Sequence, residues 1–266
     1  MDWVAVIILG LVQGLTEFLP ISSSGHLVLT ERILKVHSEN IYLEVFLHFG
    51  TFMAVVIIFR KDIRGIILAL WEGITRAKKS KDSTYYLKLF LGLLIGTVPA
   101  VVLGLFFKGY VESAFDSFLL TSWMLIITGL FLFITRISRV KKETVGLLDS
   151  LIIGLAQGFA LLPGISRSGW TIGSGLLRGI TGTKAAEFSF LLSLPAVFGA
   201  SVLKLKESLD KSLSFDTMAL YFCGALIAFI AGYISIKFLL QILKRGKLQY
   251  FGYYCIIVGT LSLIFL

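Results

Sequence analysis

Long apolar stretches dominate the chain, and their lengths constrain the fold more than any other feature. A helix needs about 20 consecutive apolar residues to cross the hydrocarbon core of a bilayer. With 56% hydrophobic and only 15% charged residues, the sequence excludes a water-soluble globular protein. We therefore predict an all-α polytopic membrane protein, formed by a single integral membrane domain over residues 1–266. Its six predicted crossing helices are Ile41–Phe59, Tyr85–Phe107, Ser117–Thr135, Ala185–Leu203, Thr217–Leu240 and Tyr250–Leu266.

Two shorter apolar stretches end in segments rich in Pro, Ser and Gly. Val4–Leu19 and Leu147–Leu162 are too short to cross, and each leads into a second short apolar piece, at Leu27–Lys35 and Trp170–Ile180. A broken helix is tolerated in hydrocarbon only where protein or a wet cavity shields its free backbone groups. The pattern therefore predicts two re-entrant helix hairpins. Ile63–Ile74 carries charges and is expected to be a surface helix.

The two breaks are related in sequence. QGLTEFLPISSSGH, which starts at Gln13, and QGFALLPGISRSGW, which starts at Gln157, match at a constant offset of 144 residues. Such a match indicates an internal duplication, with one repeat at about 1–135 and the other at about 145–266. Each repeat holds one hairpin and three crossings. Because three is odd, we predict an inverted-topology repeat, with the ligand site near the midplane of the membrane.

Basic residues concentrate in three connections between the apolar stretches. These are Arg60–Lys81, Arg136–Lys142 and Lys244–Lys247, whereas 108–116 and 204–216 hold at least as many acidic as basic residues. Cytoplasmic loops carry an excess of Lys and Arg, so the first hairpin is expected to enter the membrane from outside and the second from inside. The net charge of +9 is then directed at the membrane surface, and no nucleic-acid partner is expected.

Glu17 lies within the first short apolar stretch, where a carboxylate is costly and therefore indicates function. Gln13 precedes it by one helical turn, so both side chains project from one face. The alternative is that Glu17 only caps nearby serines. Glu44 and His48 are four residues apart near the start of the first crossing, and Glu187 occupies the related place in the second repeat. These three either surround the site or form ordinary interhelical hydrogen bonds.

Each break leads into the start of a helix, with the sequence SSSG at 22–25 and SRSG at 166–169. The free N–H groups and the positive dipole end of a helix start can bind an anion, so both are candidate phosphate sites. Ordinary N-capping by serine is the alternative. Arg167 offers a fixed charge and a fork of donors that suits phosphate. It could instead serve only as a partner for Glu17.

The polar residues are divided unequally between the two halves, with Glu17, Ser23 and His26 in the first and Arg167 in the second. The imidazole of His26 suits proton transfer or nucleophilic attack on phosphorus, or it is simply hydrogen-bonded. An inverted-repeat transporter or flippase for a lipid phosphate or another anion explains the duplication equally well. The unequal division favours an enzyme, which needs acid and base groups opposite an anion clamp.

The chain resembles a known family over nearly its whole length. QGLTEFLPISSSGH fits that family's (E/Q)-x-x-x-E pattern at Gln13 and Glu17 and continues to His26, and PGISRSGWT fits its second motif. The family is that of the membrane undecaprenyl pyrophosphate phosphatases of the bacitracin-resistance type. The resemblance implies hydrolysis of C55 polyprenyl diphosphate to the monophosphate and inorganic phosphate, which recycles the lipid carrier for cell-wall synthesis. It also implies a site open to the outer face.

The resemblance implies a role for each polar residue of the motifs. Glu17 acts as a base or metal ligand with Gln13 beside it, and the expected cofactor is a divalent cation, Mg²⁺ or Ca²⁺. Ser23 or His26 is the attacking or proton-shuttling group, and Arg167 holds the diphosphate. Gln13 stands where a carboxylate is also found, which weakens any mechanism that needs two carboxylates, and a homodimer is left open. The implied substrate-binding residues are Gln13, Ser22, Ser24, Gly25, Ser166, Ser168, Gly169 and Thr171.

Overall fold

Helices make up most of the computed structural model, which describes residues 3–34, 41–75, 80, 82–140, 142–207 and 214–265. The basic residues at 76–79, 81 and 141, on which the prediction from loop charge partly rests, lie outside this part. The first seven helices are α1 (Trp3–Phe18), α2 (Ser23–Leu34), α3 (Ile41–Ile58), α4 (Arg60–Thr75), α5 (Ser83–Phe106), α6 (Lys108–Phe115) and α7 (Phe118–Ile134). A short 3-10 turn, Thr135–Ile137, precedes α8 (Leu147–Phe159), α9 (Arg167–Leu177), α10 (Gly182–Glu207), α11 (Phe215–Lys244) and α12 (Tyr250–Phe265).

Four helical segments in the described part are long and apolar enough to cross a membrane. They are Ser83–Phe106, Phe118–Ile137, Gly182–Leu203 and Phe215–Lys244. A fifth crossing results if α3 and α4, which are bent by 75° where they meet, form one span. The 16-residue α12 is shorter than these spans. The structure thus shows a polytopic helical protein with four or five candidate spans, and the number six stays a prediction.

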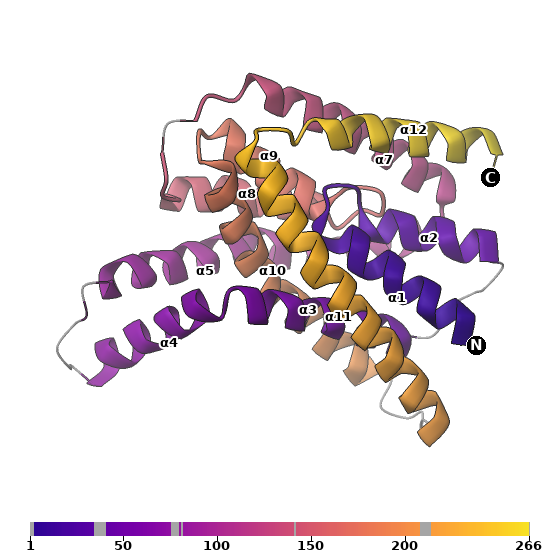
Figure 1. The fold of residues 1–266 in the computed structure, drawn as a ribbon, viewed down its shortest axis with the longest axis horizontal. Helices are drawn as coiled ribbons and strands as arrows, with labels where there is room; N and C mark the ends of the chain where they lie inside the picture. Colours follow the sequence, from indigo (N-terminus) through magenta and orange to yellow (C-terminus); the bar gives the residue numbers. More distant parts are fainter. Residues whose placement is uncertain are drawn as a thin grey trace.

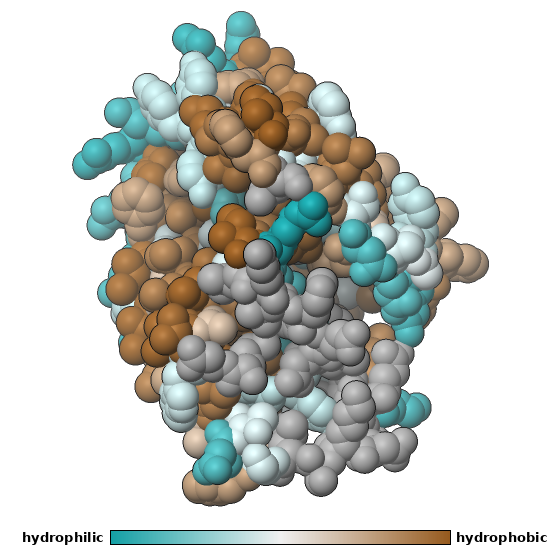
Figure 2. Space-filling model, turned by 90° about the vertical axis from the view of Figure 1, so that its right-hand side faces the viewer, coloured by the Kyte–Doolittle hydropathy of each residue, from teal (hydrophilic) through white to brown (hydrophobic). Residues whose placement is uncertain are grey.

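The long helices keep most of their apolar surface on the outside. Only 22 to 39% of the apolar window in each of the four spans is buried. Leu105 and Phe238, for example, are 64% and 50% exposed. In Figure 2, hydrophobic side chains cover much of the left half of the face, while hydrophilic ones gather mainly toward its margins. Because so large an apolar surface is unfavourable in water and favourable in lipid, this is a multi-pass membrane protein.

Helices from the two halves of the chain pack in matched pairs. α1 packs along α11, α8 packs along α5, and α7 packs against α12 (Figure 1). The more central α3 and α10 contact each other, and they also contact α11 and α5, respectively. Each predicted hairpin therefore lies on a long helix from the opposite half. The inverted repeat itself stays a prediction from the sequence.

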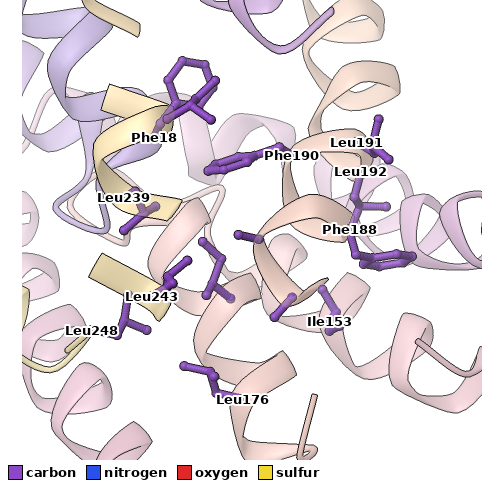
Figure 3. Packing of buried hydrophobic residues seen from close by; sticks show 14 of the residues in the cluster. Phe18, Ile153, Leu176, Phe188, Phe190, Leu191, Leu192, Leu239, Leu243 and Leu248 are labelled. Carbon is purple, nitrogen blue, oxygen red and sulfur yellow. The ribbon is translucent and has the colours of Figure 1, made fainter. Parts of the chain in front are cut away.

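A cluster of aromatic and aliphatic side chains fills the centre, where α1, α10 and α11 meet. Phe18 of α1 and Phe190 of α10 meet edge to face, with their ring centroids 5.4 Å apart and their planes at 88° (Figure 3). Leu239 and Leu243 of α11 belong to the same cluster. Because Phe18 directly follows Glu17 in sequence, this packing fixes the end of α1 that carries the carboxylate.

Candidate active site

The first break, residues 19–22 between α1 and α2, and the second break, residues 160–166 between α8 and α9, end in the same helix cap. The Ser22 hydroxyl accepts a hydrogen bond from the backbone N–H of Gly25 at 3.2 Å. The Ser166 hydroxyl accepts one from Gly169 at 3.1 Å. Both serines therefore act as N-caps. The cap satisfies one of the free N–H groups of each helix start and leaves the others available to a ligand.

Serine hydroxyls next to each break also donate hydrogen bonds to backbone carbonyls of the other break. The Ser22 hydroxyl donates to the carbonyl of Ile165 at 3.3 Å, and the Ser168 hydroxyl donates to the carbonyl of Leu19 at 3.0 Å. The hydroxyl of Thr128 on α7 bonds to the second break from the side, by donating to the carbonyl of Gly164 at 3.0 Å. The broken backbone is thus satisfied by protein, as a re-entrant segment requires.

Glu17 and Arg167, which are 150 residues apart in sequence, form an ion pair between the two halves. Arg167 Nη2 donates to Glu17 Oε1 at 2.6 Å. The other carboxylate oxygen accepts from Ser23 Oγ at 2.6 Å and from Gln13 Nε2 at 3.1 Å. The side chains of Glu17 and Arg167 are only 8% and 16% exposed. The structure therefore joins four of the residues singled out in the sequence in one buried polar cluster.

A chain of polar contacts supports this cluster from α3. The carboxylate of Glu17 can only accept, so the Gln13 contact is donated by its amide nitrogen. The same nitrogen lies 3.0 Å from Nδ1 of His48, which must then accept. His48 Nε2 lies 3.9 Å from Glu44 Oε1. His48 thus contacts Gln13, and Glu44 contacts His48. Both reach the Glu17 carboxylate through Gln13.

Two polar atoms of the cluster are buried without a hydrogen-bond partner in the described part of the chain. They are Gln13 Oε1 and Arg167 Nη1. Buried polar atoms are normally paired, so this acceptor and this donor are candidates to bind a group that the chain itself does not supply. A small pocket at Glu17 and Arg167 is also lined by Thr51 and Ser193 and by apolar side chains of α1, α3 and α10. Among its polar lining groups the Arg167 guanidinium can donate to an anion, whereas the hydroxyls of Thr51 and Ser193 donate to the backbone carbonyls of their own helices.

Some of the predicted site residues have other surroundings. Glu187 accepts hydrogen bonds from Lys184 at 2.8 Å and from Tyr85 at 3.1 Å, and it is not among the residues that contact Glu17. Thr171 donates to the carbonyl of Arg167 at 2.7 Å and bonds to Ser189 of α10. It therefore holds the start of α9 in place. Whether these two residues take part in binding stays a prediction.

The small residues at the two helix starts serve close packing. Ser24 lies 3.2 Å from the Ser22 hydroxyl, and Ser168 lies 3.2 Å from the Ser166 hydroxyl. A Cβ on Gly25 would lie 3.1 Å from the Cα of Gly164 in the second break. A side chain at this position would crowd the two breaks apart, because that separation is tighter than an ordinary van der Waals contact.

Three residues near the site were missed in the sequence. Thr51 stands three residues after His48, and this helical spacing could have placed it on the same face. Ser193 of α10 also lines the pocket, and Tyr254 of α12 lies 2.8 Å from the Nε2 of His26. Neither stands in a recognisable motif, so only the packing of distant helices brings them to the site.

A ready-made metal cage is absent from the described residues, where no three His, Cys, Asp or Glu side chains gather. Gln13 Oε1 is an unpaired oxygen beside the Glu17 carboxylate, and oxygen ligands are those that Mg²⁺ and Ca²⁺ prefer. Mg²⁺ is often bound by one or two protein oxygens together with substrate phosphates. The residues therefore fit a cation that arrives with a phosphate ligand and takes most of its coordination from it.

The fold and the site together define a polytopic helical membrane protein with an anion-binding centre in its interior. The chain belongs to the BacA family, described as bacitracin resistance protein BacA, whose family model matches residues 6–261. This match covers both breaks and all the site residues.

Curated relatives are similar over nearly their full lengths. A protein of Halothermothrix orenii named undecaprenyl-diphosphatase is 43% identical, over 99% of this chain and 98% of the relative. Proteins of the same name from Korarchaeum cryptofilum and Carboxydothermus hydrogenoformans are 44% and 41% identical. Each of these alignments covers 97% of this chain, with 97% and 95% of the respective relative.

Proposed function

We propose that this chain hydrolyses undecaprenyl diphosphate to undecaprenyl phosphate and inorganic phosphate. The observation that carries the proposal is the buried Glu17–Arg167 pair, which has an unpaired guanidinium nitrogen and an unpaired amide oxygen beside it. The family membership and the names of the relatives support the same reaction. The reaction recycles a lipid carrier for cell-wall synthesis, and greater bacitracin resistance is expected in cells that make more of this enzyme.

Arg167 is the group that recognises the diphosphate. Its guanidinium has one nitrogen on Glu17 and another that is buried and free, so a phosphate oxygen can bind the free nitrogen without breaking the ion pair. The starts of α2 and α9 meet at the same place and add free N–H groups. In phosphoryl transfer the protein mainly positions the groups and neutralises the charge on the equatorial oxygens, and these groups can do both.

Ser23 is the nucleophile that the geometry favours. Its hydroxyl donates to Glu17 Oε2 at 2.6 Å, the arrangement of a nucleophile and its base. Ser23 Oγ attacks the terminal phosphorus and its proton passes to Glu17, while the bond from phosphorus to the bridging oxygen breaks and undecaprenyl phosphate leaves. Water then hydrolyses the phosphoserine, so that inorganic phosphate is released and the hydroxyl is restored. His26 is less suited to attack, because both ring nitrogens already have partners.

Glu17 and Gln13 would hold the divalent cation, Mg²⁺ or Ca²⁺, together with the diphosphate. When bound, the cation neutralises negative charge on the phosphate oxygens. We expect phosphate release to be lost in EDTA and restored by an excess of Mg²⁺ or Ca²⁺. Full activity in EDTA would remove the cation from the proposal.

The lipid tail of the substrate stays in the hydrocarbon while its headgroup enters the pocket. The pocket wall formed by Phe52, Val55, Leu194 and Val197 is apolar, which suits a ligand that arrives from the lipid. The resemblance to the family leads us to place the protein in the inner membrane with its site open to the outer face, and the basic connections support cytoplasmic loops at 60–81, 136–142 and 244–247. Labelling of single cysteines in the connection 108–116 by an impermeant reagent added to intact cells tests this orientation.

The decisive experiment is a phosphate-release assay with purified protein in detergent. Undecaprenyl diphosphate is the substrate, and inorganic phosphate and the lipid monophosphate are both measured. We expect equal amounts of the two products. A carrier or flippase would bind the same lipid without releasing phosphate, so the absence of both products from a folded, lipid-binding preparation would overturn the proposal.

A further inference from the structure

His26 has a partner on each ring nitrogen, and the two partners define its tautomer. Its Nδ1 lies 2.8 Å from the backbone carbonyl oxygen of Ser22. A carbonyl oxygen can only accept, so Nδ1 carries the hydrogen. In a neutral ring Nε2 is then an acceptor, and the hydroxyl of Tyr254, 2.8 Å away, must donate to it. When His26 is neutral, its lone pair on Nε2 is therefore held by Tyr254.

The carbonyl that holds Nδ1 is itself set by an unusual backbone conformation. Ser22 has a φ of 70°, in the left-handed region that residues other than glycine rarely adopt. Its carbonyl accepts both the ring N–H and the backbone N–H of His26, the latter at 3.1 Å. Strained backbone at such a site is maintained only when its surroundings determine it. The orientation of His26 is thus fixed on one side by the first break.

The ring of Tyr254 fixes the other side. It stacks on the His26 ring with centroids 5.6 Å apart and planes at 10°. Tyr254 belongs to α12, 228 residues away in sequence, so the contact joins the first hairpin to α12. Stacking and hydrogen bonding together hold the imidazole in one plane.

The matched position in the second break carries an apolar pair. Trp170 stands 144 residues after His26, and its ring stacks on Phe131 of α7 at a centroid distance of 4.5 Å and an angle of 17°. α7 and α12 pack against each other. His26 and Trp170 thus each stack on an aromatic ring of α12 or α7, yet only the His26 pair has a hydroxyl facing a ring nitrogen. Packing alone needs no such hydroxyl, as Phe131 demonstrates.

We propose that Tyr254 is a positioning residue of the phosphatase, one that keeps His26 in a single orientation while its charge changes. The proposal rests on the proposed function. The tyrosine hydroxyl donates to neutral Nε2, and after a simple rotation of its O–H it can accept from a protonated Nε2–H. His26 can thus take up a proton and return it without turning its ring.

The Tyr254–His26 contact can affect catalysis because His26 lies close to Ser23 on α2. His26 lies one turn after Ser23 on the same side of α2, since residues three apart are neighbours on a helix surface. Because both ring nitrogens have partners, a proton from the water that hydrolyses the phosphoserine reaches Nε2 through Tyr254: the tyrosine O–H gives its proton to Nε2 while the tyrosine oxygen takes one from the water, and the reverse transfer protonates the departing phosphate. General acid–base groups contribute only when they are held in position. Loss of the tyrosine hydroxyl should therefore slow turnover without weakening substrate binding.

The test compares Tyr254→Phe, which keeps the stacked ring, with Tyr253→Phe as a matched control. The ring of Tyr253 packs against Phe133, and its neighbour in sequence makes the contact under test. We expect kcat for phosphate release to fall about tenfold in Tyr254→Phe with KM within about twofold of the wild type. Tyr253→Phe should keep both constants. An unchanged kcat in Tyr254→Phe would overturn the proposal.

Nitrogen NMR on histidine-labelled protein reads the contact independently of activity. At about pH 8.5, where an ordinary imidazole is neutral, the signals of His26 are identified by their loss in His26→Gln. We expect a protonated Nδ1 and an Nε2 signal that moves to the value of a free acceptor in Tyr254→Phe but not in Tyr253→Phe. An Nε2 signal that does not move would overturn the proposal.

The two measurements separate this inference from the proposed function. A wild-type protein with the expected Nε2 signal but no phosphate release would overturn the proposed function, and with it the catalytic use of Tyr254. Active wild-type protein whose Tyr254→Phe variant loses neither turnover nor the Nε2 signal would overturn only the inference about Tyr254.

Discussion

The two breaks have the same backbone arrangement but different chemistry. Each ends in a serine N-cap, and each sends one serine hydroxyl to a carbonyl of the other break. The differences that change the chemistry are at Glu17, Ser23 and His26, where the second half has Leu161, Arg167 and Trp170. The first hairpin thus carries the carboxylate, hydroxyl and imidazole next to its break, whereas the second carries the guanidinium.

The same type of broken helix can therefore carry either the carboxylate side or the guanidinium side of a phosphate-cleaving site. Hydrogen bonds between the breaks satisfy the backbone in both cases, so the side chains that face the pocket are free to differ. Opposite charges on the two halves then attract each other across their contact, as Glu17 and Arg167 do at 2.6 Å. Substitutions at each break can separate the two roles, because phosphate release reports on chemistry and the melting temperature reports on folding.

Glu17→Gln should have the largest effect, because it removes the base for Ser23 and the counter-charge of Arg167 together. We expect kcat/KM for phosphate release to fall at least 100-fold, about 2.7 kcal/mol. Glu112→Gln, at an exposed ion pair with Lys108, is the matched control and should retain activity. Activity within threefold of the wild type in Glu17→Gln would make the first break purely structural.

Gly164→Ala tests the backbone of the second break. Gly164 has a φ of 89°, and a Cβ built on it would lie 2.2 Å from the backbone oxygen of Thr121. Strain and overlap should together lower stability by about 2 kcal/mol or more, measured by thermal unfolding in detergent. Gly199→Ala in α10, where a Cβ meets nothing within 4 Å, should be neutral or stabilising. Equal melting temperatures for both variants would contradict this account of the turn.

Arg167→Lys keeps the charge of the second break but loses the fork of donors. A lysine cannot hold Glu17 with one nitrogen and a phosphate oxygen with another in the same fixed geometry. We expect turnover to fall at least tenfold, about 1.4 kcal/mol, with folding preserved on size-exclusion chromatography. Arg178→Lys at the other end of α9 is the control and should stay near wild type. Near-wild-type phosphate release from Arg167→Lys would take Arg167 out of the site.

Asp149→Asn should have the smallest effect and concerns an ion-pair cluster that only the second hairpin has. Asp149, in the first turn of α8, accepts from Lys142 at 2.5 Å and from Arg178 at 2.8 Å, which joins the start of α8 to the end of α9. The matched position in the first hairpin is Ala5. Because Lys142 and Arg178 are more than a third exposed, we expect a loss of about 1 kcal/mol at pH 7.

The pH dependence of this loss has a definite sign. Burial opposes ionisation of Asp149, but hydrogen bonds from Lys142 and Arg178 outweigh it and hold the pKa of the carboxyl below its usual range. Stability from such a group is present above the unfolded pKa, roughly 3.9, and is lost as the pH falls through the folded value. The difference in melting temperature between wild type and Asp149→Asn should therefore shrink below about pH 4. Asp116→Asn is the control and should keep the melting temperature of the wild type both at pH 7 and at low pH. A difference between wild type and Asp149→Asn that grows at low pH would contradict the assignment.

Much of the local structure could be predicted from the sequence. The apolar runs, the two breaks and the surface segment at 63–74 all correspond to observed helices and helix ends, because helix formation depends on neighbours three and four residues apart. The predicted crossing Ile41–Phe59 corresponds to the helix α3, Ile41–Ile58. What the sequence did not predict is the bend of 75° where α3 meets α4. The bend depends on how these helices pack.

The amino-acid sequence indicated the kinds of groups at the site, since a carboxylate, a serine-rich cap and an arginine in apolar surroundings are costly unless used. The matched breaks also suggested Arg167 as a partner for Glu17, but the atoms that actually meet depend on how the helices pack. The contact of Arg167 with Glu17 and that of His26 with Tyr254 span 150 and 228 residues. No local periodicity encodes such pairs, because they form only when α1 packs on α11 and α7 on α12 and bring distant helix ends together.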